Sequence, residues 1–382
     1  MATEGMRDFG QKVDLCQRIR DVLTNYPEGA LLKEAVQNAD DAGAGRFCVL
    51  LDLREHGRAR LACPGAAGHQ GPAIVTYNDA VFTDTDFESI QHVGASRKAE
   101  SEGRAKTGRF GVGFNSCYHA TDLPSFLSRQ FLVVFDPHCT HLPNASPHDP
   151  GKIIDFSTEG LAAQFPDTFA PYHVFGCETA AGEPFAGTIF RLPLRTAEQA
   201  AASRITKRAF AVDAARALLK DFVAALPELC LFLTHIRSVE VSTWEAGESA
   251  PQRLCALDTR DAASGGAPKR QPLAQHVAAA RDDLRALPQT QSSVRLQVDV
   301  AAEGASRRAV WLVAESLGGG RAREMCGDEL VLAHGLQPLP WAGVAARLHG
   351  GDAAVSGRPY CLLPLPTETG LPVHINLSLI HI

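Results

Sequence analysis

The stretch LLKEAVQNADDA at positions 31–42 constrains the fold most, because it carries two patterns at once. Its apolar residues recur at the three- and four-residue spacing of an α-helix. On that helix Glu34, Asn38 and Asp41 stand at i, i+4 and i+7, so they line one face. The apolar positions fill most of the remaining circumference, and we therefore expect the polar stripe to face inward as well.

A buried stripe of two carboxylates and an amide is costly unless it binds a partner. Magnesium that bridges phosphates is a suitable partner, because this ion prefers oxygen ligands. Asn38 offers a neutral oxygen, and Glu34 is placed to polarise an attacking water. The alternative is a solvated helix face with polar pairs one turn apart. Taken alone, the stretch favours that alternative.

The rest of the first half of the chain predicts an α+β fold. Helical spacing recurs at positions 13–23, and Thr83 followed by Asp86 marks another helix start. Compact apolar runs predict strands at 47–51, 73–77, 131–135 and 188–192. We therefore expect residues 1–195 to form a sandwich in which helices cover one face of a mixed sheet.

After Thr196 alanine and arginine become dense. The pattern predicts a helix at 212–223, a loop at 258–272 and a strand at 294–300. We expect residues 196–376 to form a smaller α/β region, with a boundary near residue 195. The last residues, 377–382, form an apolar stub that we interpret as a truncation or an artefactual end of a longer protein.

Composition excludes several classes of function. The formal net charge is −6, whereas a nucleic-acid partner usually requires a basic stripe, so we expect no nucleic acid. The sequence holds no apolar run long enough to span a membrane, and its N-terminus lacks the apolar segment of a secretory signal. The ten cysteines form no C-x-x-C pair. They are expected to be reduced thiols of a cytoplasmic protein.

Three weaker motifs follow along the chain. Asn78 and Asp79 end a strand, where a carboxylate can accept a hydrogen bond from an adenine amino group; the alternative is ordinary turn chemistry. Gly108, Gly111 and Gly113 precede a helix start, where glycine lets the backbone approach a phosphate, although a tight turn needs the same residues. Thr188 enters a strand and offers a hydroxyl, though threonine is also a common strand residue.

The order of these motifs resembles the successive nucleotide-binding boxes of the GHKL ATPases, which include Hsp90, MutL, type II topoisomerases and histidine kinases. The segments FGQK (9–12), QNADDA (37–42), YNDAVF (77–82), GVGFNS (111–116) and FRLPLR (190–195) are similar to the sacsin-type repeat of that superfamily. The resemblance is dense to about residue 195 and sparse after it. It implies a Bergerat fold, as in the N-terminal domain of Hsp90, with ATP held between a helical layer and a mixed sheet.

The resemblance also implies roles for individual residues. Glu34 is the general base, Asn38 holds Mg²⁺, and Asp79, or alternatively Asn78, reads the adenine. The rest of the nucleotide-binding set consists of Asp41, Lys98 in a lid at 94–107, Gly108, Gly111, Val112, Gly113, Phe114 and Thr188. In one respect the sequence departs from Hsp90: counted from Asp79, the adenine box has Val81 and Thr83 where Hsp90 has glycines.

We therefore expect a chaperone-like module that binds ATP and hydrolyses it slowly, acting in protein folding or quality control. Its expected partners are client proteins and co-chaperones of the Hsp70 system. The missing glycines favour an alternative, a scaffold domain that binds nucleotide without hydrolysis or serves protein interaction only. A DNA-dependent or histidine-kinase branch of the superfamily is less well supported, because neither a basic surface nor a phospho-acceptor helix is found in the sequence.

Overall fold

One mixed sheet organises the computed structural model, which describes residues 14–25, 27–91, 113–268, 289–302, 304–318, 324, 341–351 and 354–377. Within these ranges fourteen strands pair in a single order. Across the sheet they are β13 (Leu363–Pro364), β12 (Pro359–Cys361), β14 (His374–Leu377), β11 (Trp341–His349), β10 (Ala305–Leu317), β9 (Thr290–Ala302), β8 (Gln252–Asp261), β7 (Ser238–Trp244), β1 (Arg46–Asp52), β2 (Ala73–Asn78), β6 (Phe185–Pro193), β3 (Ser125–Arg129), β4 (Phe131–Phe135) and β5 (Gly151–Asp155). The β1–β7 and β12–β14 pairs are parallel, and the others are antiparallel.

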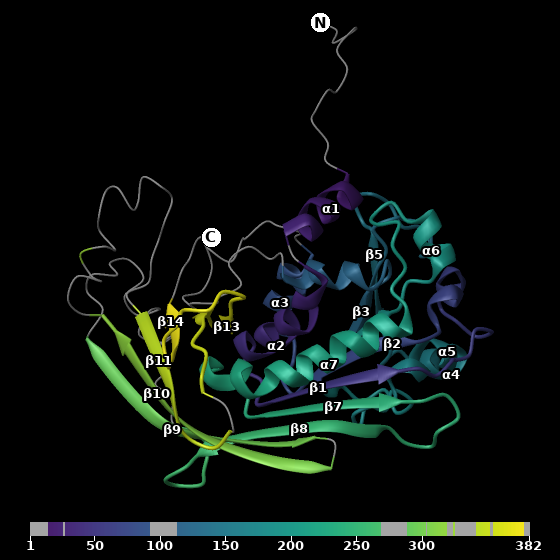
Figure 1. Ribbon diagram of the computed structural model, residues 1–382. Coiled ribbons are helices and arrows are strands. Elements are labelled where there is room, and N and C mark those ends of the chain that lie inside the picture. Colours follow the sequence, from purple (N-terminus) through teal and green to yellow (C-terminus); the bar gives the residue numbers. More distant parts are fainter. Residues whose placement is uncertain are drawn as a thin grey trace, which may run out of the picture.

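The longer helices cover one face of this sheet, and the short α4, α5 and η5 pack on the other (Figure 1). The α-helices are α1 (Leu15–Asn25), α2 (Leu31–Asp41), α3 (Asp84–Ser89), α4 (Leu161–Gln164), α5 (Pro166–Phe169), α6 (Ala197–Ala202) and α7 (Val212–Leu229). Short 3₁₀ helices are η1 (Glu28–Ala30), η2 (Pro64–His69), η4 (Gly113–His119), η5 (Ala170–Tyr172) and η6 (Cys230–Phe232). The predicted α+β class with a mixed sheet is therefore confirmed, and so is each helix and strand predicted above.

The second half of the chain differs from its prediction. Among the described residues after 195 there are eight strands, β7 to β14, so this part is richer in strands than a smaller α/β region. The predicted loop at 258–272 is wrong at its start, because β8 continues to Asp261. Strand β7 pairs with β1 and thereby continues the sheet across the predicted boundary near residue 195. The division into domains stays a prediction.

Helix α2 ends in a well-defined cap. Gly43 adopts a φ of +83°, a left-handed conformation that glycine takes without a steric penalty. The N–H of Ala44 donates to the carbonyl of Ala39 at 3.0 Å, and the N–H of Gly43 donates to that of Asp40 at 2.9 Å. These two bonds form a Schellman motif and satisfy carbonyls that the helix end would leave free. The cap fixes where the polar stripe of α2 stops.

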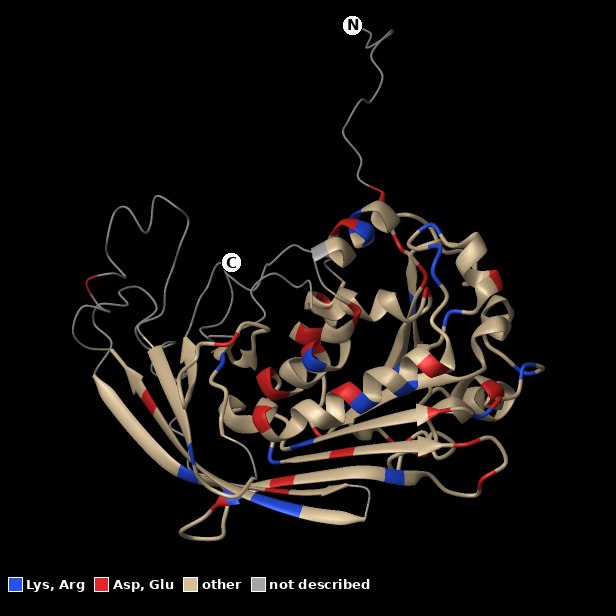
Figure 2. Cartoon of the chain, in the orientation of Figure 1, with Lys and Arg blue, Asp and Glu red and all other residues tan. Residues whose placement is uncertain are grey.

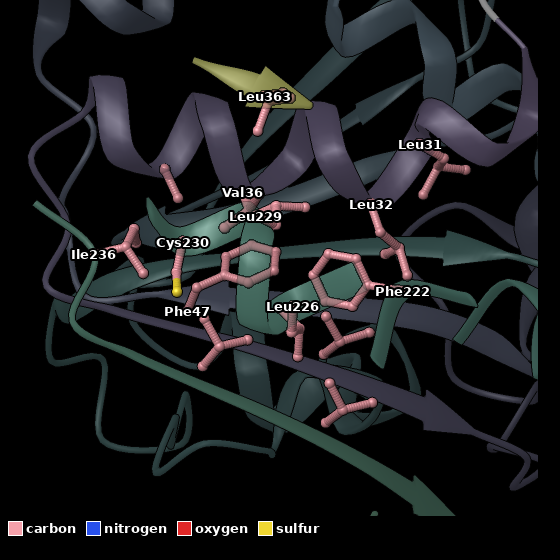
Figure 3. Packing of buried hydrophobic residues seen from close by; sticks show 14 of the residues in the cluster. Leu31, Leu32, Val36, Phe47, Phe222, Leu226, Leu229, Cys230, Ile236 and Leu363 are labelled. Atoms are coloured by element: carbon pink, nitrogen blue, oxygen red, sulfur yellow. The ribbon is translucent and has the colours of Figure 1, made fainter. Parts of the chain in front are cut away.

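The main core lies between the helices and the sheet. Leu32 and Val36 of α2 are fully buried and pack in one apolar cluster with Phe47 of β1 and Phe222 of α7 (Figure 3). The Phe47 and Phe222 rings meet edge to face, with centroids 6.4 Å apart. A second cluster, which includes Leu50 and neighbouring strand residues, fills the opposite face. Because both faces are covered, β1 is apolar from Phe47 to Leu51 without alternating, between Arg46 at its start and Asp52 at its end.

Charge is spread over the described part of the chain. Figure 2 shows acidic and basic positions interspersed along helices and strands. Among the described residues, no helix combines the length and the apolar character that crossing a membrane requires.

Candidate functional site

The polar stripe of α2 and the start of η4 lie against each other. A Cβ atom built on Gly113 would collide with Oε2 of Glu34 and would lie 3.9 Å from Nδ2 of Asn38. A larger residue at position 113 would therefore require the end of the Glu34 side chain to move. Two segments that are far apart in sequence thus bring a carboxylate, an amide and a glycine backbone to one place.

Glu34 and Asn38 differ in their surroundings. Glu34 is half-buried, and desolvation raises the pKa of its carboxyl above the ordinary value of 4.5. Asn38 is exposed one turn further along, so its amide is accessible to a ligand. Asp41 is half-exposed in the last turn of the helix. The stripe therefore runs from a sheltered carboxylate to an accessible amide, so the expectation that it faces inward is wrong for Asn38.

Several predicted nucleotide-binding residues lie outside the described residues. These are Lys98, Gly108, Gly111 and Val112, together with the predicted lid at 94–107. Gly113 and Phe114 are described, and they open η4, in agreement with the predicted helix start. The roles assigned to all of these residues stay predictions.

A row of side chains on the sheet faces the same helical layer. Phe47, Asn78, Thr188 and Ser128 are directly opposite one another across β1, β2, β6 and β3, so they share one face. Phe47 belongs to the core beneath α2, which identifies that face as the helix-covered one. Asn78 and Thr188 are buried. The predicted base-reading and supporting residues are therefore adjacent.

Asp79 lies elsewhere. Its Oδ1 accepts hydrogen bonds from the N–H of Gly45 at 2.8 Å and of Arg46 at 3.0 Å. It lines an open cavity of about 560 Å³ together with Arg237 and Arg260. The carboxylate is thus engaged at the start of β1 and is not beside Thr188, so Asn78 is the better candidate of the two for contact with a base.

The choice of Asn78 changes which residues replace the missing glycines. Counted from Asn78, the two glycine places of the adenine box fall on Ala80 and Phe82 rather than on Val81 and Thr83. The Phe82 ring packs against Phe126, with centroids 4.6 Å apart, and against Phe87 at 5.3 Å. It belongs to a cluster of phenylalanines whose other members are Phe114, Phe131, Phe135 and Phe190. No periodic pattern in the sequence predicts this cluster, because its members come from six separate segments.

The structural role of Asp40 was also not predicted from the sequence. Its carboxylate is buried and accepts three backbone N–H groups, from Thr234 at 2.9 Å, His235 at 2.7 Å and Ile236 at 2.8 Å. The residue thus ties the end of α2 to the turn that leads into β7. Within the QNADDA motif, therefore, Asp40 holds the fold together while Asn38 stays accessible.

We expect Asp40→Ala to lower the free energy of unfolding by about 3 kcal/mol, because it leaves backbone donors without their charged acceptor. Urea unfolding followed by circular dichroism measures the change. The matched control is Asp221→Ala, an exposed aspartate of α7, for which a change within about 0.5 kcal/mol is expected. Equal effects of the two substitutions would contradict the anchoring role of Asp40.

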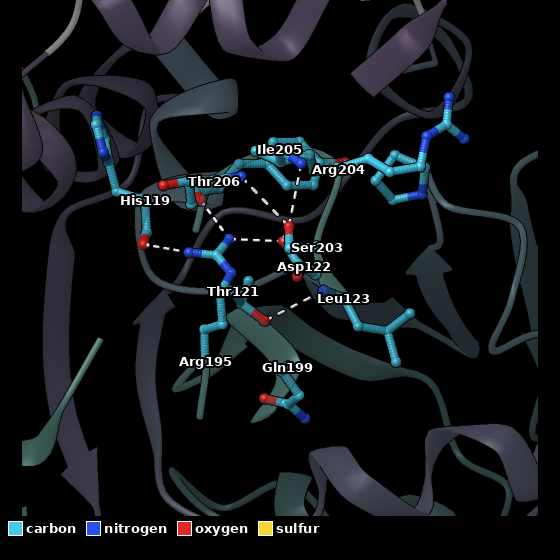
Figure 4. Close-up of polar contacts among 12 residues, drawn as sticks. His119, Thr121, Asp122, Leu123, Arg195, Gln199, Ser203, Arg204, Ile205 and Thr206 are labelled. Carbon is cyan, nitrogen blue, oxygen red and sulfur yellow. Dashed lines mark hydrogen bonds and ion pairs between the residues drawn. The ribbon is translucent and has the colours of Figure 1, made fainter. Parts of the chain in front are cut away.

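The far end of η4 is held by Arg195 (Figure 4). The guanidinium of this fully buried residue donates to the carbonyls of Tyr118 at 2.6 Å and His119 at 2.9 Å. It also pairs with Oδ1 of Asp122 at 2.7 Å, and Ser203 donates to the same oxygen at 3.1 Å. One arginine thus connects η4, which begins at Gly113, with the segment that follows α6.

The donor set fits a magnesium-bound phosphate. Glu34 and Asn38 offer hard oxygen ligands of the kind that Mg²⁺ prefers. Gly113 leaves a space that a Cβ would fill, and the first N–H groups of a helical turn favour an anion. The buried row at Asn78 and Thr188 lies on the sheet face that this helical layer covers.

Comparison with known proteins points to one family. The model of the Sacsin domain matches residues 12–256. Human (Homo sapiens) sacsin is 32% identical to this chain over 378 residues, a match that covers 97% of this chain and 8% of the human protein. The chain therefore spans less than a tenth of the length of this relative.

Proposed function

The chain belongs to the Sacsin domain family, and from that premise we propose that it is a magnesium-dependent module that binds ATP and hydrolyses it slowly. Its fold is proposed to be of the Bergerat type, like the N-terminal domain of Hsp90. Within a longer protein it would serve folding or quality control in the cytoplasm. Client proteins and co-chaperones of the Hsp70 system are the proposed partners.

One observation carries this proposal. Gly113, at the start of η4, lies beside the Glu34 carboxylate and within 4 Å, measured from a built Cβ, of the Asn38 amide of α2. A solvated helix face, the alternative for residues 31–42, does not require a glycine backbone to be packed against its carboxylate. Such a glycine suits a phosphate site, because its backbone can approach the ligand from one side while the metal-binding side chains approach from the other.

Each residue then has a defined task. Magnesium, when bound, would neutralise charge on the phosphates. Asn38 would offer that ion an oxygen ligand, and the backbone N–H of Gly113 would donate to a phosphate oxygen. Glu34 accepts a proton from the attacking water; burial raises its pKa toward neutral pH, which improves a carboxylate as a general base. Thr188 supports the base-binding end through the loop after β2.

Calorimetry with MgATP tests the binding step. We expect Asn38→Ala to weaken binding at least about tenfold, because the ion loses a direct oxygen ligand. Removal of magnesium with a chelator should weaken wild-type binding to a similar degree. The matched control is Gln37→Ala, which removes the neighbouring amide of α2 from a different side of the helix and should leave the affinity unchanged.

The same measurement separates the proposal from its alternative. Absence of heat at millimolar MgATP in the folded wild-type protein would reject nucleotide binding and leave an interaction scaffold. The packed Phe82 ring in a glycine place favours that scaffold. Binding that is insensitive to both Asn38→Ala and the chelator would reject Asn38 as the metal ligand.

A further inference from the structure

The loop after β2 is held by three polar residues of the buried row. The N–H of Ala80 donates to Oδ1 of Asn78 at 3.1 Å, and the hydroxyl of Thr188 donates to the carbonyl of Ala80 at 2.8 Å. The N–H of Phe82 donates to Oγ of Ser128 at 3.1 Å. Asn78, Thr188 and Ser128 are 7%, 1% and 0% exposed. Three hydrogen bonds to side chains of the sheet therefore hold the loop that occupies the place of the glycine box.

These bonds fix the orientation of the Asn78 amide. A backbone N–H donates to oxygen and not to an NH₂ group, so the atom that faces Ala80 is Oδ1. The Nδ2 group, with its two protons, is on the other side of the amide. Oδ1 has a second lone pair, so Asn78 keeps both an acceptor and a donor for a ligand.

The two hydroxyls of the row are already committed. Ser128 donates to the carbonyl of Gly187 at 2.8 Å, and Thr188 donates to that of Ala80. Each hydroxyl carries one proton, so neither has another to offer a base. Within the row of Asn78, Thr188 and Ser128, discrimination between bases therefore rests on the Asn78 amide.

Resting on the function proposed above, we propose that Asn78 reads the purine and that this site accepts guanine as well as adenine nucleotides. Adenine donates its 6-amino group to Oδ1 and accepts a hydrogen bond at N1 from Nδ2. Guanine, displaced along the plane of the fixed amide, donates its N1–H to Oδ1 and accepts at its 6-oxo group from Nδ2. A carboxylate in this position has only acceptors and repels the guanine oxygen, but an amide does not. The chain therefore lacks the feature by which a carboxylate selects ATP.

Calorimetric titration of the full chain with MgATP and MgGTP tests the proposal. We expect the two dissociation constants of the wild-type protein to agree within about threefold. Asn78→Asp should shift the ratio toward ATP by about tenfold or more, because the guanine oxygen then faces a buried carboxylate. Asp79→Asn should leave the ratio unchanged, since the Asp79 carboxylate is bound to Gly45 and Arg46.

Each outcome has one meaning. Wild-type protein that binds MgATP at least about tenfold more tightly than MgGTP overturns the proposal without any need for a variant, so a folding defect in Asn78→Asp does not leave it untested. A change of selectivity in Asp79→Asn also overturns it. If neither nucleotide binds, the ATP-binding function itself has failed, and this result differs from a preference for ATP.

Discussion

Glu34→Gln is expected to lower the rate of ATP hydrolysis by about 10²- to 10⁴-fold, the usual contribution of a general base. The substitution keeps the shape of the side chain but removes its ability to accept a proton from water. Affinity for MgATP should change little, because the amide still fits against Gly113. Steady-state phosphate release and calorimetry, made on the same preparation, measure the two quantities.

A matched control is available close by. Glu28 precedes α2, and its carboxylate pairs with Arg208 at 3.1 Å. Glu28→Gln should therefore leave hydrolysis unchanged. Equal turnover by the wild-type protein and Glu34→Gln would remove Glu34 from the mechanism. Equal losses in the two variants would attribute the effect to stability rather than to chemistry.

The stability of Glu34→Gln provides an independent check with a defined sign. Burial raises the pKa of Glu34 in the folded protein above its ordinary value of 4.5. Its contribution to stability is therefore complete below pH 4.5 and is lost as the pH rises through the raised folded pKa. Without nucleotide, Glu34→Gln should melt at a higher temperature than the wild-type protein at neutral pH. This advantage should vanish below pH 4.5.

Arg195→Met is expected to destabilise the protein by about 3–5 kcal/mol, because it leaves the carboxylate of Asp122 buried without its cation. The arginine side chain is fully buried, and Asp122 is 5% exposed. The carbonyls of Tyr118 and His119 lose donors at the same time. Urea unfolding measures the loss, and a change below about 1 kcal/mol would contradict this account.

Two further variants separate charge from geometry. Arg195→Met combined with Asp122→Asn should recover part of the stability, because the unpaired charge is removed. Arg195→Lys keeps the charge but loses the two-nitrogen fork that holds the carbonyls at the end of η4. If this network positions Gly113, a folded Arg195→Lys protein should bind MgATP more weakly than the wild-type protein. Unchanged affinity would limit Arg195 to stability.

Local pattern was sufficient for the elements that carry the site. The sequence alone predicts a helix that places Glu34 and Asn38 one turn apart. The structure contains this helix as α2, at residues 31–41. The glycines of the 108–113 segment predicted a close approach, and Gly113 lies beside both side chains. These features depend on helical periodicity and on the absence of a Cβ, which are properties of single segments.

Which of Asn78 and Asp79 faces the helical layer could not be predicted from the sequence. They are neighbours, and side chains on a strand alternate between its faces, so the strand register decides this point. The pairing of Asn78 with Thr188, in the row that begins at Phe47, puts Asn78 on the helix-covered face. Strand pairing over more than a hundred residues is a property of the whole fold rather than of a motif.

The strands of the second half were largely missed for a different reason. In β10 the run ASRRAVWLVAESL places arginine and alanine where a strand usually carries β-branched residues. Only its inner positions, such as Trp311 and Val313, are deeply buried. The hydrogen bond between Arg195 and Asp122 could not be predicted from the sequence either, because it joins residues that are 73 positions apart.

The central claim is that α2, the start of η4 and the row at Asn78 enclose one nucleotide. A crystal structure of the chain with MgATP and the Glu34→Gln substitution tests this claim most directly. We predict magnesium on Asn38, phosphate oxygens on the backbone at Gly113, and the base beside Asn78 and Thr188. A nucleotide bound in the cavity beside Asp79 and Arg237, or triphosphate density remote from Gly113, would contradict it.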